Sequence, residues 1–320
     1  MSPRTALRLS TVKPATLAAY RGAVEEFASW CLTHALPLQT LKQVDHALTL
    51  YFTSLYLDGE GAAKARYARF GYILLRTSLD GDKAHSLPES RKALQGFATL
   101  DPGVTREPLP ECVVYDMIVF FLKNVGLDVA VCALLQYDTY ARPSEALCLV
   151  PADFSGPAPA AGASFRASWC VNLANAERGL ARKNGECDDA VRIGSPGREW
   201  IKDVVGKYLR LCKADVPLFN LDLAAYERAF RRAAKALRLG ALKPTPHSLR
   251  HSGPSNDAWA KTRSLAEIQA RGGWKVPKSV SRYEKHGMLL RQLARLDTSQ
   301  QKRARSSAAS LGMLLVKALP

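Results

Sequence analysis

Two histidines and an arginine stand close together near residue 250, where a helix is predicted to begin. Thr245 suits the N-cap of this helix and Pro246 its first position. His247 then shares a helical face with Arg250 at i+3 and His251 at i+4. An imidazole and a guanidinium at the positive end of a helix can bind a phosphate group. A basic chain also produces this pattern by chance, so a solvated helix start is the alternative at this point.

Further residues with chemical potential lie on both sides of this helix. Downstream, Trp274 follows two glycines, and Tyr283 stands nine residues after it. Upstream, the segment ARPSEAL places Arg142 and Glu145 inside an apolar stretch that is predicted to be helical. A buried arginine requires a charged or polar partner. We therefore expect Arg142 to be paired, with Glu145 as the nearest acid.

These segments, in this order, resemble the conserved boxes of the tyrosine recombinases, the phage-integrase family. The match is closest to the Cre-like branch, which has tryptophan where most members have a second histidine. The 24 residues from Arg250 to Trp274 and the nine to Tyr283 suit the family pattern. The resemblance covers about residues 10–300, and it is stronger in the second half. The boxes are ARPSEAL at 141–147, RKNG at 182–185, HSLRH at 247–251, GW at 273–274 and Tyr283.

The resemblance implies a role for each acidic and basic residue of the first and third boxes. Arg142 takes the place of the first catalytic arginine, and Glu145 that of the acid that supports it. His247 and Arg250 match the family's H-x-x-R box, where the histidine assists proton transfer or orients the phosphate. His251 is a supporting residue that could exchange roles with His247.

The remaining boxes supply the nucleophile and the groups beside it. Tyr283 is implied to be the nucleophile, and it is the only tyrosine after Tyr226. Trp274 would pack in the site or donate a hydrogen bond from its indole N–H. Lys183 would be the catalytic lysine on a β-turn and the candidate general acid. Arg182 is adjacent and could occupy that position instead.

Elementary chemistry agrees with these implied roles. A phenol with a pKa near 10 is only about 0.1% ionised at neutral pH, so a nucleophilic tyrosine needs a base or strongly positive surroundings. Two planar guanidiniums can each bind the non-bridging oxygens of a phosphodiester with two hydrogen bonds. Such a clamp removes the need for a metal ion. A covalent 3′-phosphotyrosine would retain the energy of the broken bond, so resealing would need no nucleotide cofactor.

Other common chemistries have no motif in the sequence. The phosphate loop GxxxxGK[ST], the dinucleotide motif GxGxxG, HExxH and GxSxG are all absent. The seven cysteines are odd in number and include no C-x-x-C pair, which argues against a disulfide framework and a zinc site and favours a reducing compartment. We expect no cofactor and no metal.

Hydrophobic periodicity predicts a mainly α chain of two domains, and the resemblance gives them roles. Residues 1–105 are expected to be an all-α core-binding domain that contacts DNA. Residues 106–320 are expected to be a mostly helical catalytic domain with a small antiparallel sheet and a C-terminal tail. A proline-rich segment at 102–110 marks the boundary. Helices are predicted from 14, at 40–57, 62–79, 88–98, 111–123, 127–149, 196–213, 222–239, 246–260 and 264–271 and beyond 277, with a loop at 155–164 and a hairpin of 167–173 with 189–193.

The charge of the chain points to a polyanionic partner. Lysine and arginine number 45 against 29 acidic residues, which gives a formal charge of +16. The first 227 residues are neutral in sum, so the whole excess lies in residues 228–320. A surface of this kind suits the phosphates of DNA.

The expected partners are therefore double-stranded DNA carrying a specific recombination site and further copies of the chain. The resemblance implies a synaptic tetramer in which a C-terminal helix packs in trans, using the leucines of 288–296 or of 311–319. The most apolar run, 113–135, is interrupted by charged residues, so no membrane span is expected. We expect a protein located inside the cell on DNA, in the nucleoid of a bacterium or the nucleus of a eukaryote.

The leading hypothesis is a site-specific DNA recombinase that cleaves and rejoins strands through a 3′-phosphotyrosyl intermediate. A type IB-like topoisomerase would use a similar set of residues to relax supercoils as a monomer. A domesticated DNA-binding protein would recognise sites without cleaving them. The presence of Arg142, Arg250 and Tyr283 together argues against the last alternative.

Overall fold

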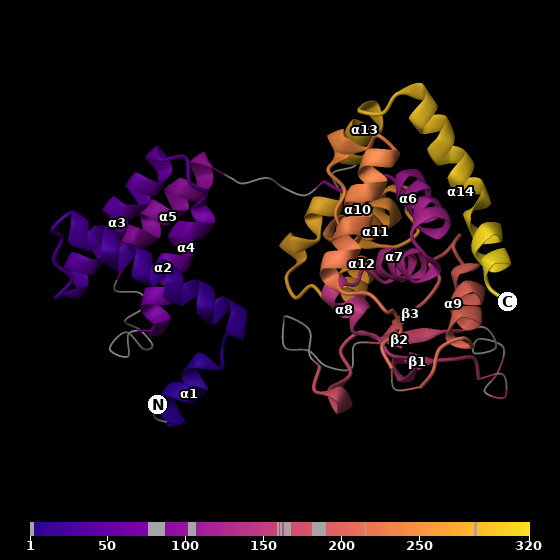
Figure 1. The fold of residues 1–320 in the computed structure, drawn as a ribbon, viewed down its shortest axis with the longest axis horizontal. Coiled ribbons are helices and arrows are strands. Elements are labelled where there is room, and N and C mark those ends of the chain that lie inside the picture. Colours follow the sequence, from indigo (N-terminus) through magenta and orange to yellow (C-terminus); the bar gives the residue numbers. More distant parts are fainter. Residues whose placement is uncertain are drawn as a thin grey trace. The chain divides into compact units, whose positions relative to one another are not determined.

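A computed structural model gives the fold of the chain as two compact units, Met1–Thr105 and Arg106–Pro320 (Figure 1). Each unit has a hydrophobic core of its own. The structure describes residues 3–75, 87–101, 107–158, 160, 162, 168–180, 190–214, 216–284 and 287–320.

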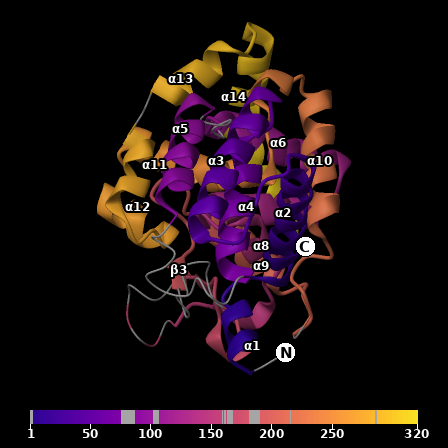
Figure 2. The ribbon, with the colours of Figure 1, turned by 90° about the vertical axis from the view of Figure 1, so that its left-hand side faces the viewer.

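The first unit is all helical over its described residues (Figure 2). Helix α2 packs on α4, and α3 packs on α5. Phe27, Leu48 and Phe52 are fully buried between these helices because the apolar residues recur on one face of each. The helices are α1 (Pro3–Leu9), α2 (Pro14–Thr33), α3 (Leu41–Leu57), α4 (Ala62–Leu75) and α5 (Pro88–Leu100).

A buried carboxylate joins two helices of this unit. Asp45, in the second turn of α3, accepts hydrogen bonds from the backbone N–H groups of Glu89 at 2.9 Å and Ser90 at 2.8 Å. These amides lie at the start of α5, where a helix leaves N–H groups without partners and favours a negative charge. The carboxylate thus fixes the start of α5 against α3.

The second unit is mostly helical, with one small sheet. Its helices are α6 (Glu111–Asn124), α7 (Leu127–Thr139), α8 (Pro143–Leu147), α9 (Ile201–Leu209), α10 (Leu223–Ala236), α11 (Pro246–Ala260), α12 (Leu265–Gly272), α13 (Gly287–Ala294) and α14 (Thr298–Ala318). Short 3-10 turns are η3 (Pro151–Asp153), η6 (Ala176–Arg178), η7 (Gly240–Leu242), η8 (Pro277–Ser279) and η9 (Ser281–Glu284). A mainly α fold with a small antiparallel sheet is confirmed.

The predicted single helix over 127–149 is wrong, because the chain turns between α7 and α8. Tyr140 adopts the left-handed conformation (φ 57°, ψ 24°) at the end of α7. Pro143 then takes the first position of α8, where its missing N–H costs nothing. As a result Arg142 is the N-cap of a short helix and not a residue inside a long one.

The sheet has three antiparallel strands in the order β1-β2-β3. Strand β2 (Cys170–Asn172) pairs with β3 (Ala190–Arg192), with Val171 opposite Val191, as the predicted hairpin requires. Strand β1 (Phe154–Ser155) was not predicted, and it places Phe154 opposite Val171. The segment that joins β2 to β3 includes residues 181–189, which lie outside the described residues.

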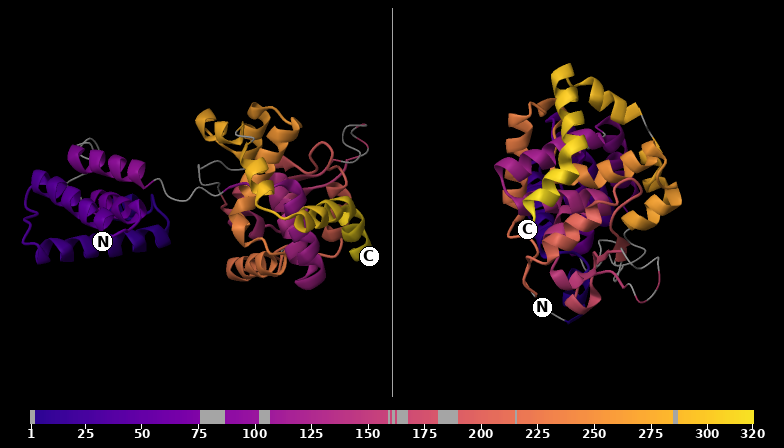
Figure 3. Two further views of the ribbon diagram at one scale, coloured as in Figure 1. Left: turned by 90° about the horizontal axis from the view of Figure 1, so that it is seen from above. Right: turned by 90° about the vertical axis from the view of Figure 1, so that its right-hand side faces the viewer.

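The C-terminal helix α14 lies against α6 of its own chain (Figures 1 and 3). Leu311 and Leu315 are fully buried there. Asp116 on α6 accepts hydrogen bonds from Arg303 Nε and Ser307 Oγ, each at 2.8 Å. The helix is therefore held by both apolar burial and a buried carboxylate.

Across the residues that the structure describes, no helix has both the length and the apolar character that a membrane span requires.

Candidate active site

Helix α11 carries three of the predicted site residues on its first turns. Thr245 is the N-cap and Pro246 the first helical residue, as expected, and Ser248 Oγ accepts a hydrogen bond from the Thr245 N–H at 3.2 Å. His247 and His251 are half-buried, and their ring centroids lie 5.3 Å apart. The capped helix start thus places two imidazoles on one face, one turn apart.

Arg250 is almost fully buried at the centre of the site. Its Nη1 donates to the carbonyl oxygen of Tyr140 at 2.5 Å, and its Nη2 donates to the carbonyl oxygen of Gly272 at 2.9 Å. The guanidinium also lies over the ring of Trp274, 4.8 Å from the centroid. These contacts tie α11 to the end of α7 and the end of α12, and they fix the orientation of the guanidinium.

Glu145 connects the two arginines. Its carboxylate accepts a hydrogen bond from the Arg142 backbone N–H at 2.7 Å and pairs with the Arg142 guanidinium. The Arg142 guanidinium contacts Oε1, and Oε2, which accepts from the Arg142 N–H, also lies 3.9 Å from Arg250 Nη1. Burial on its own would raise the pKa of Glu145, but the Arg142 N–H and the two guanidiniums outweigh it and hold the pKa below its usual value. The acid therefore stays ionised between Arg142 and Arg250.

Tyr283 lies on η9 and is 3% exposed. Its hydroxyl oxygen is 3.2 Å from His251 Nδ1. Burial raises the pKa of the phenol to about 12, and the nearby charges of Arg250 and Arg282 only partly offset this. The phenol is therefore neutral in the free protein, with an imidazole in reach of its proton.

Trp274 packs between the buried arginine and the phenol. Its ring centroid is 5.2 Å from that of Tyr283 and 6.4 Å from that of Tyr140. A Cβ on Gly272 would lie 1.7 Å from the indole, so a glycine is required there. Gly273, at φ 61°, then ends α12 and turns the chain toward the ring.

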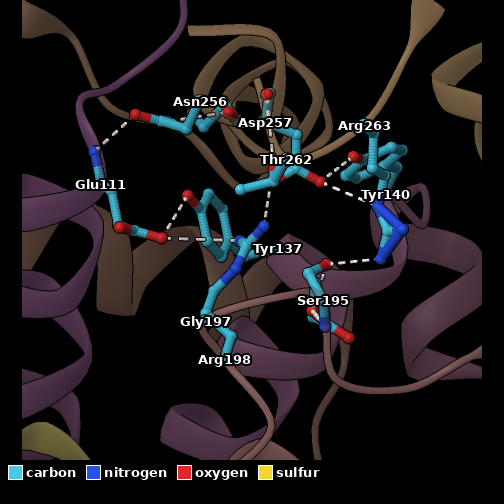
Figure 4. A network of polar contacts seen from close by, with 12 residues as sticks. Glu111, Tyr137, Tyr140, Ser195, Gly197, Arg198, Asn256, Asp257, Thr262 and Arg263 are labelled. Atoms are coloured by element: carbon cyan, nitrogen blue, oxygen red, sulfur yellow. Dashed lines mark hydrogen bonds and ion pairs between the residues drawn. The ribbon is translucent and has the colours of Figure 1, made fainter. Parts of the chain in front are cut away.

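A network of buried ion pairs stands behind this site, and the sequence reasoning missed it. Asp257 on α11 pairs with Arg198 and, at 3.1 Å, with Arg263, and it also accepts a hydrogen bond from the Tyr140 hydroxyl (Figure 4). All four side chains come from different segments of the second unit. One available signal was Asp257 itself, which follows Arg250 by seven residues and so shares its helical face, in a segment where acids are scarce.

A second buried pair holds the turn before Arg142. Asp138 accepts hydrogen bonds from the N–H groups of Gly194 at 2.8 Å and Ser195 at 3.1 Å, and it pairs with Arg271 at 3.2 Å. Arg271 also donates to the carbonyl oxygen of Asp138 at 2.7 Å. These contacts fix the end of α7 to the turn that follows β3 and to α12.

The structure brings together most of the residues singled out in the sequence. Arg142, Glu145, Arg250, Trp274 and Tyr283 form one connected cluster with His251, and the His247 ring makes an edge contact with that of His251. Lys183 and Arg182 lie outside the described residues.

The cluster has the chemistry of an anion site with a nucleophile. The buried phenol of Tyr283 contacts one imidazole and the ring of Trp274, over which the Arg250 guanidinium lies. A single carboxylate lies between that guanidinium and the one of Arg142. Within the described parts of the chain, no group of three or more histidine, cysteine or acidic side chains is placed to hold a metal ion. The arrangement suits a phosphate ester that is attacked by the tyrosine.

The chain's likeness to known proteins lies in its fold. Neither a protein-family model nor a curated protein matches the sequence. The XerH site-specific recombinase bound to difH substrate, in a pre-cleavage complex, is 18% identical with a TM-score of 0.52 over 84% of this chain and 75% of that chain. A post-cleavage complex of XerH with a palindromic difH substrate is 15% identical with a TM-score of 0.50 over 78% and 70%. The chain therefore has the fold of a site-specific recombinase.

Proposed function

We propose that this protein is a site-specific DNA recombinase of the tyrosine type, which cleaves and rejoins strands without a metal or ATP. The observation that carries the proposal is the placement of the Tyr283 hydroxyl beside His251 and in the same cluster as Arg142 and Arg250. The fold shared with XerH, which was solved bound to its difH substrate, supports DNA as the substrate. The tryptophan at 274 supports the Cre-like branch.

The cleavage step uses the two arginines as a phosphate clamp. Arg142 and Arg250 bind the non-bridging oxygens of the scissile phosphate, where negative charge grows as the phosphorus becomes five-coordinate. Glu145 holds Arg142 in place and remains ionised. Because the guanidiniums are fixed by protein contacts before DNA binds, little reorganisation is needed.

Tyr283 supplies the nucleophile. Its oxygen attacks phosphorus and forms the phosphotyrosyl bond, while the bond from phosphorus to the 5′-oxygen breaks. The phenol proton passes to Nδ1 of His251, which is 3.2 Å away. This transfer uses the tautomer in which Nδ1 is the unprotonated nitrogen. His247, whose ring makes an edge contact with that of His251, orients the phosphate or takes part in proton transfer.

The leaving 5′-oxygen requires a proton from a separate acid. Lys183 is the proposed donor, and Arg182 is the alternative occupant of that position. The 3′-phosphotyrosyl bond then conserves the energy of the broken phosphodiester. A 5′-hydroxyl from a second DNA strand attacks it, releases Tyr283 and seals the new junction.

Recombination requires two DNA sites and therefore several copies of the protein. We propose a synaptic tetramer on DNA, with the all-helical first unit as the second DNA-binding arm. Exchange of the C-terminal helix in trans would move Leu311 and Leu315 from their own core to the same surface of a neighbouring copy. The Asp116 contacts with Arg303 and Ser307 would re-form across that interface.

A trapping experiment tests this function. A pool of random-sequence duplexes with a nick is incubated with the protein, denatured, and searched for DNA that stays attached to it. A nick just beyond the cleavage site releases a short oligonucleotide, so the covalent intermediate accumulates. Tyr208→Phe is the control, because it removes a tyrosine hydroxyl on α9, outside the cluster. We expect an adduct with the wild-type protein and with this control, and none with Tyr283→Phe. No adduct from the wild type, or an adduct from Tyr283→Phe, would contradict the proposal.

Two further measurements on the same protein distinguish the recombinase from a topoisomerase and from a non-cleaving DNA-binding protein. Relaxation of supercoiled plasmid by a monomer, without exchange between two sites, would indicate a topoisomerase. Specific retention of DNA with no adduct would indicate a binding protein that does not cleave.

A further inference from the structure

Tyr140 contacts Arg250 through its backbone and precedes Arg142 by two residues, and its backbone conformation is one that a side chain disfavours. At φ 57° and ψ 24° it occupies the left-handed region, where a Cβ crowds the following carbonyl. It ends α7, and Arg142 follows two residues later as the N-cap of α8. A tyrosine keeps such a conformation only when the surrounding contacts hold it there.

The side chain of Tyr140 is held by a charged network. Its hydroxyl donates to Asp257, and its ring is fully buried (Figure 4). Asp257 is in turn fixed by Arg198 and Arg263. Because an acceptor that is itself paired twice cannot swing away, the hydroxyl has one defined position.

Helix α11 packs so closely on the Tyr140 ring that no side chain fits between them. Gly253 on α11 has no side chain, and a Cβ there would lie 2.5 Å from Tyr140 Cδ1 and 2.4 Å from the Tyr137 carbonyl oxygen. The glycine and the tyrosine therefore fit each other. Their contact sets how closely the end of α7 approaches the helix that carries Arg250.

The backbone of Tyr140 acts on both arginines. Its carbonyl oxygen accepts a hydrogen bond from Arg250 Nη1 at 2.5 Å. The turn that it makes sets the start of α8, where Glu145 pairs with Arg142. Rotation of the Tyr140 backbone out of the left-handed region would move both the carbonyl and the start of α8, and so change the spacing of the two guanidiniums.

We propose that Tyr140 is a positioning residue, whose hydroxyl, through Asp257, fixes the distance between the two arginines that bind the scissile phosphate. The inference rests on the proposed function, because it assigns Tyr140 to that reaction. Tyr140 itself does not contact the reacting atoms. Its contribution is the geometry of Arg142 and Arg250.

The test removes only the hydroxyl. Tyr140→Phe keeps the ring that fills the space beside Gly253 but cannot bond Asp257. Tyr208→Phe is the matched control, since it also deletes a buried hydroxyl bonded to a carboxylate, Asp128 at 2.7 Å, but on α9. Two quantities are measured on a duplex whose sequence the trapping experiment has identified. They are its dissociation constant from the protein before reaction and the single-turnover rate of adduct formation.

We expect Tyr140→Phe to bind DNA within twofold of the wild type and to form the adduct about tenfold to a hundredfold more slowly, as for a small misplacement of reacting groups. In an Arg142→Lys background the same change should cost less than about threefold, because residues that act through one another are not additive. Arg263→Gln, which weakens the hold on Asp257 from a half-buried position, should show the same pattern with a smaller loss. This variant carries the test if Tyr140→Phe does not fold.

Each outcome decides the proposal. A wild-type rate for Tyr140→Phe, a loss no larger than that of Tyr208→Phe, or a full loss in the Arg142→Lys background would overturn the positioning role. If the wild-type protein itself forms no adduct, the proposed function fails and not only this role. If the wild type reacts and Tyr140→Phe reacts at the same rate, only the inference about Tyr140 fails.

Discussion

The protonation state of Tyr283 governs how the proposed reaction can begin. Burial raises the pKa of this phenol to about 12, so at pH 7 only about one molecule in 10⁵ carries the phenolate. Spontaneous ionisation would leave the site almost always without a nucleophile. The imidazole of His251, 3.2 Å from the hydroxyl, is placed to take the proton during attack.

We therefore predict that His251→Ala slows adduct formation by about a hundredfold at pH 7, the usual range for loss of a general base. Without a base the reaction depends on the phenolate, whose fraction grows about tenfold per pH unit below a pKa of 12. The rate of the variant should thus rise about tenfold per unit from pH 7 to 9, and that of the wild type less steeply. Single-turnover rates across this range provide the measurement.

His46→Ala provides a control, because His46 is an exposed histidine of the first unit. It should leave both the rate and its pH profile unchanged. Equal rates and parallel profiles for His251→Ala and the wild type would exclude His251 as the base.

At the residue scale, the sequence indicated side chains that meet in one cluster but not the contacts between them. Arg142, Arg250, Trp274 and Tyr283 were expected together, and the structure brings them together. Their roles in the reaction stay predictions. Tyr140 was not singled out as a site residue, because neither its left-handed backbone nor a partner 117 residues away can be recognised from local spacing.

At the scale of elements, helix α13 is attached to the start of the second unit through one carboxylate. Glu107 accepts hydrogen bonds from Arg291 at 2.5 Å, Gln292 at 2.6 Å and Arg295 at 2.6 Å. The helix begins at Gly287, shortly after Tyr283. Two donors from α13 and one from the residue directly after it thus meet a single acid, which restrains this helix.

Glu107→Ala should loosen α13 with little effect on the rest of the unit. The two arginines are more than one-third exposed, so screening by solvent limits the cost to about 1 kcal/mol or less. Amide hydrogen exchange in 287–294 should become up to about fivefold faster, while exchange in α14 stays the same. Mass spectrometry of peptides from both helices gives this comparison.

Glu60→Ala removes an exposed partner of Lys64 in the first unit and serves as the control. Unchanged exchange in α13 after Glu107→Ala would show that its apolar contacts, such as buried Leu289, hold the helix without the acid.

The positions of most elements followed from hydrophobic period and caps, and the exceptions have physical causes. Helix α11 begins at Pro246 as Thr245 and Pro246 indicate. The stretch 127–149 is apolar both before and after the turn that separates α7 from α8. Hydrophobic periodicity therefore predicted one helix across this turn, and Pro143 was the only residue that indicated its end. Strand β1 is two residues long and carries no alternation of its own, since its pairing with β2 defines it.

At the scale of the whole molecule, charge is distributed unevenly along the sequence. All of the net +16 arises after residue 227, in the segment that contains His247, Arg250, Trp274 and Tyr283. The basic end is therefore both an electrostatic surface and part of the proposed site. The first 227 residues contribute Arg142 and Glu145 to the same cluster, although they are neutral in sum.

This distribution predicts that DNA binding weakens steeply with salt. Each phosphate neutralised contributes about −0.9 to the slope of log affinity against log salt, and six or more contacts would reduce affinity by at least about a thousandfold between 50 and 200 mM. Fluorescence anisotropy of a labelled duplex in a salt series measures the slope. Affinity that does not change with salt would contradict an electrostatic DNA-binding surface.

The attachment site of trapped DNA tests the central claim most directly. The covalent adduct is digested with nuclease and protease, and the peptide that retains a nucleotide phosphate is sequenced by mass spectrometry. The account predicts a 3′-phosphate on the phenolic oxygen of Tyr283 and on no other residue. A phosphate on a different side chain, or a wild-type protein that binds its DNA and never becomes attached to it, would contradict the account.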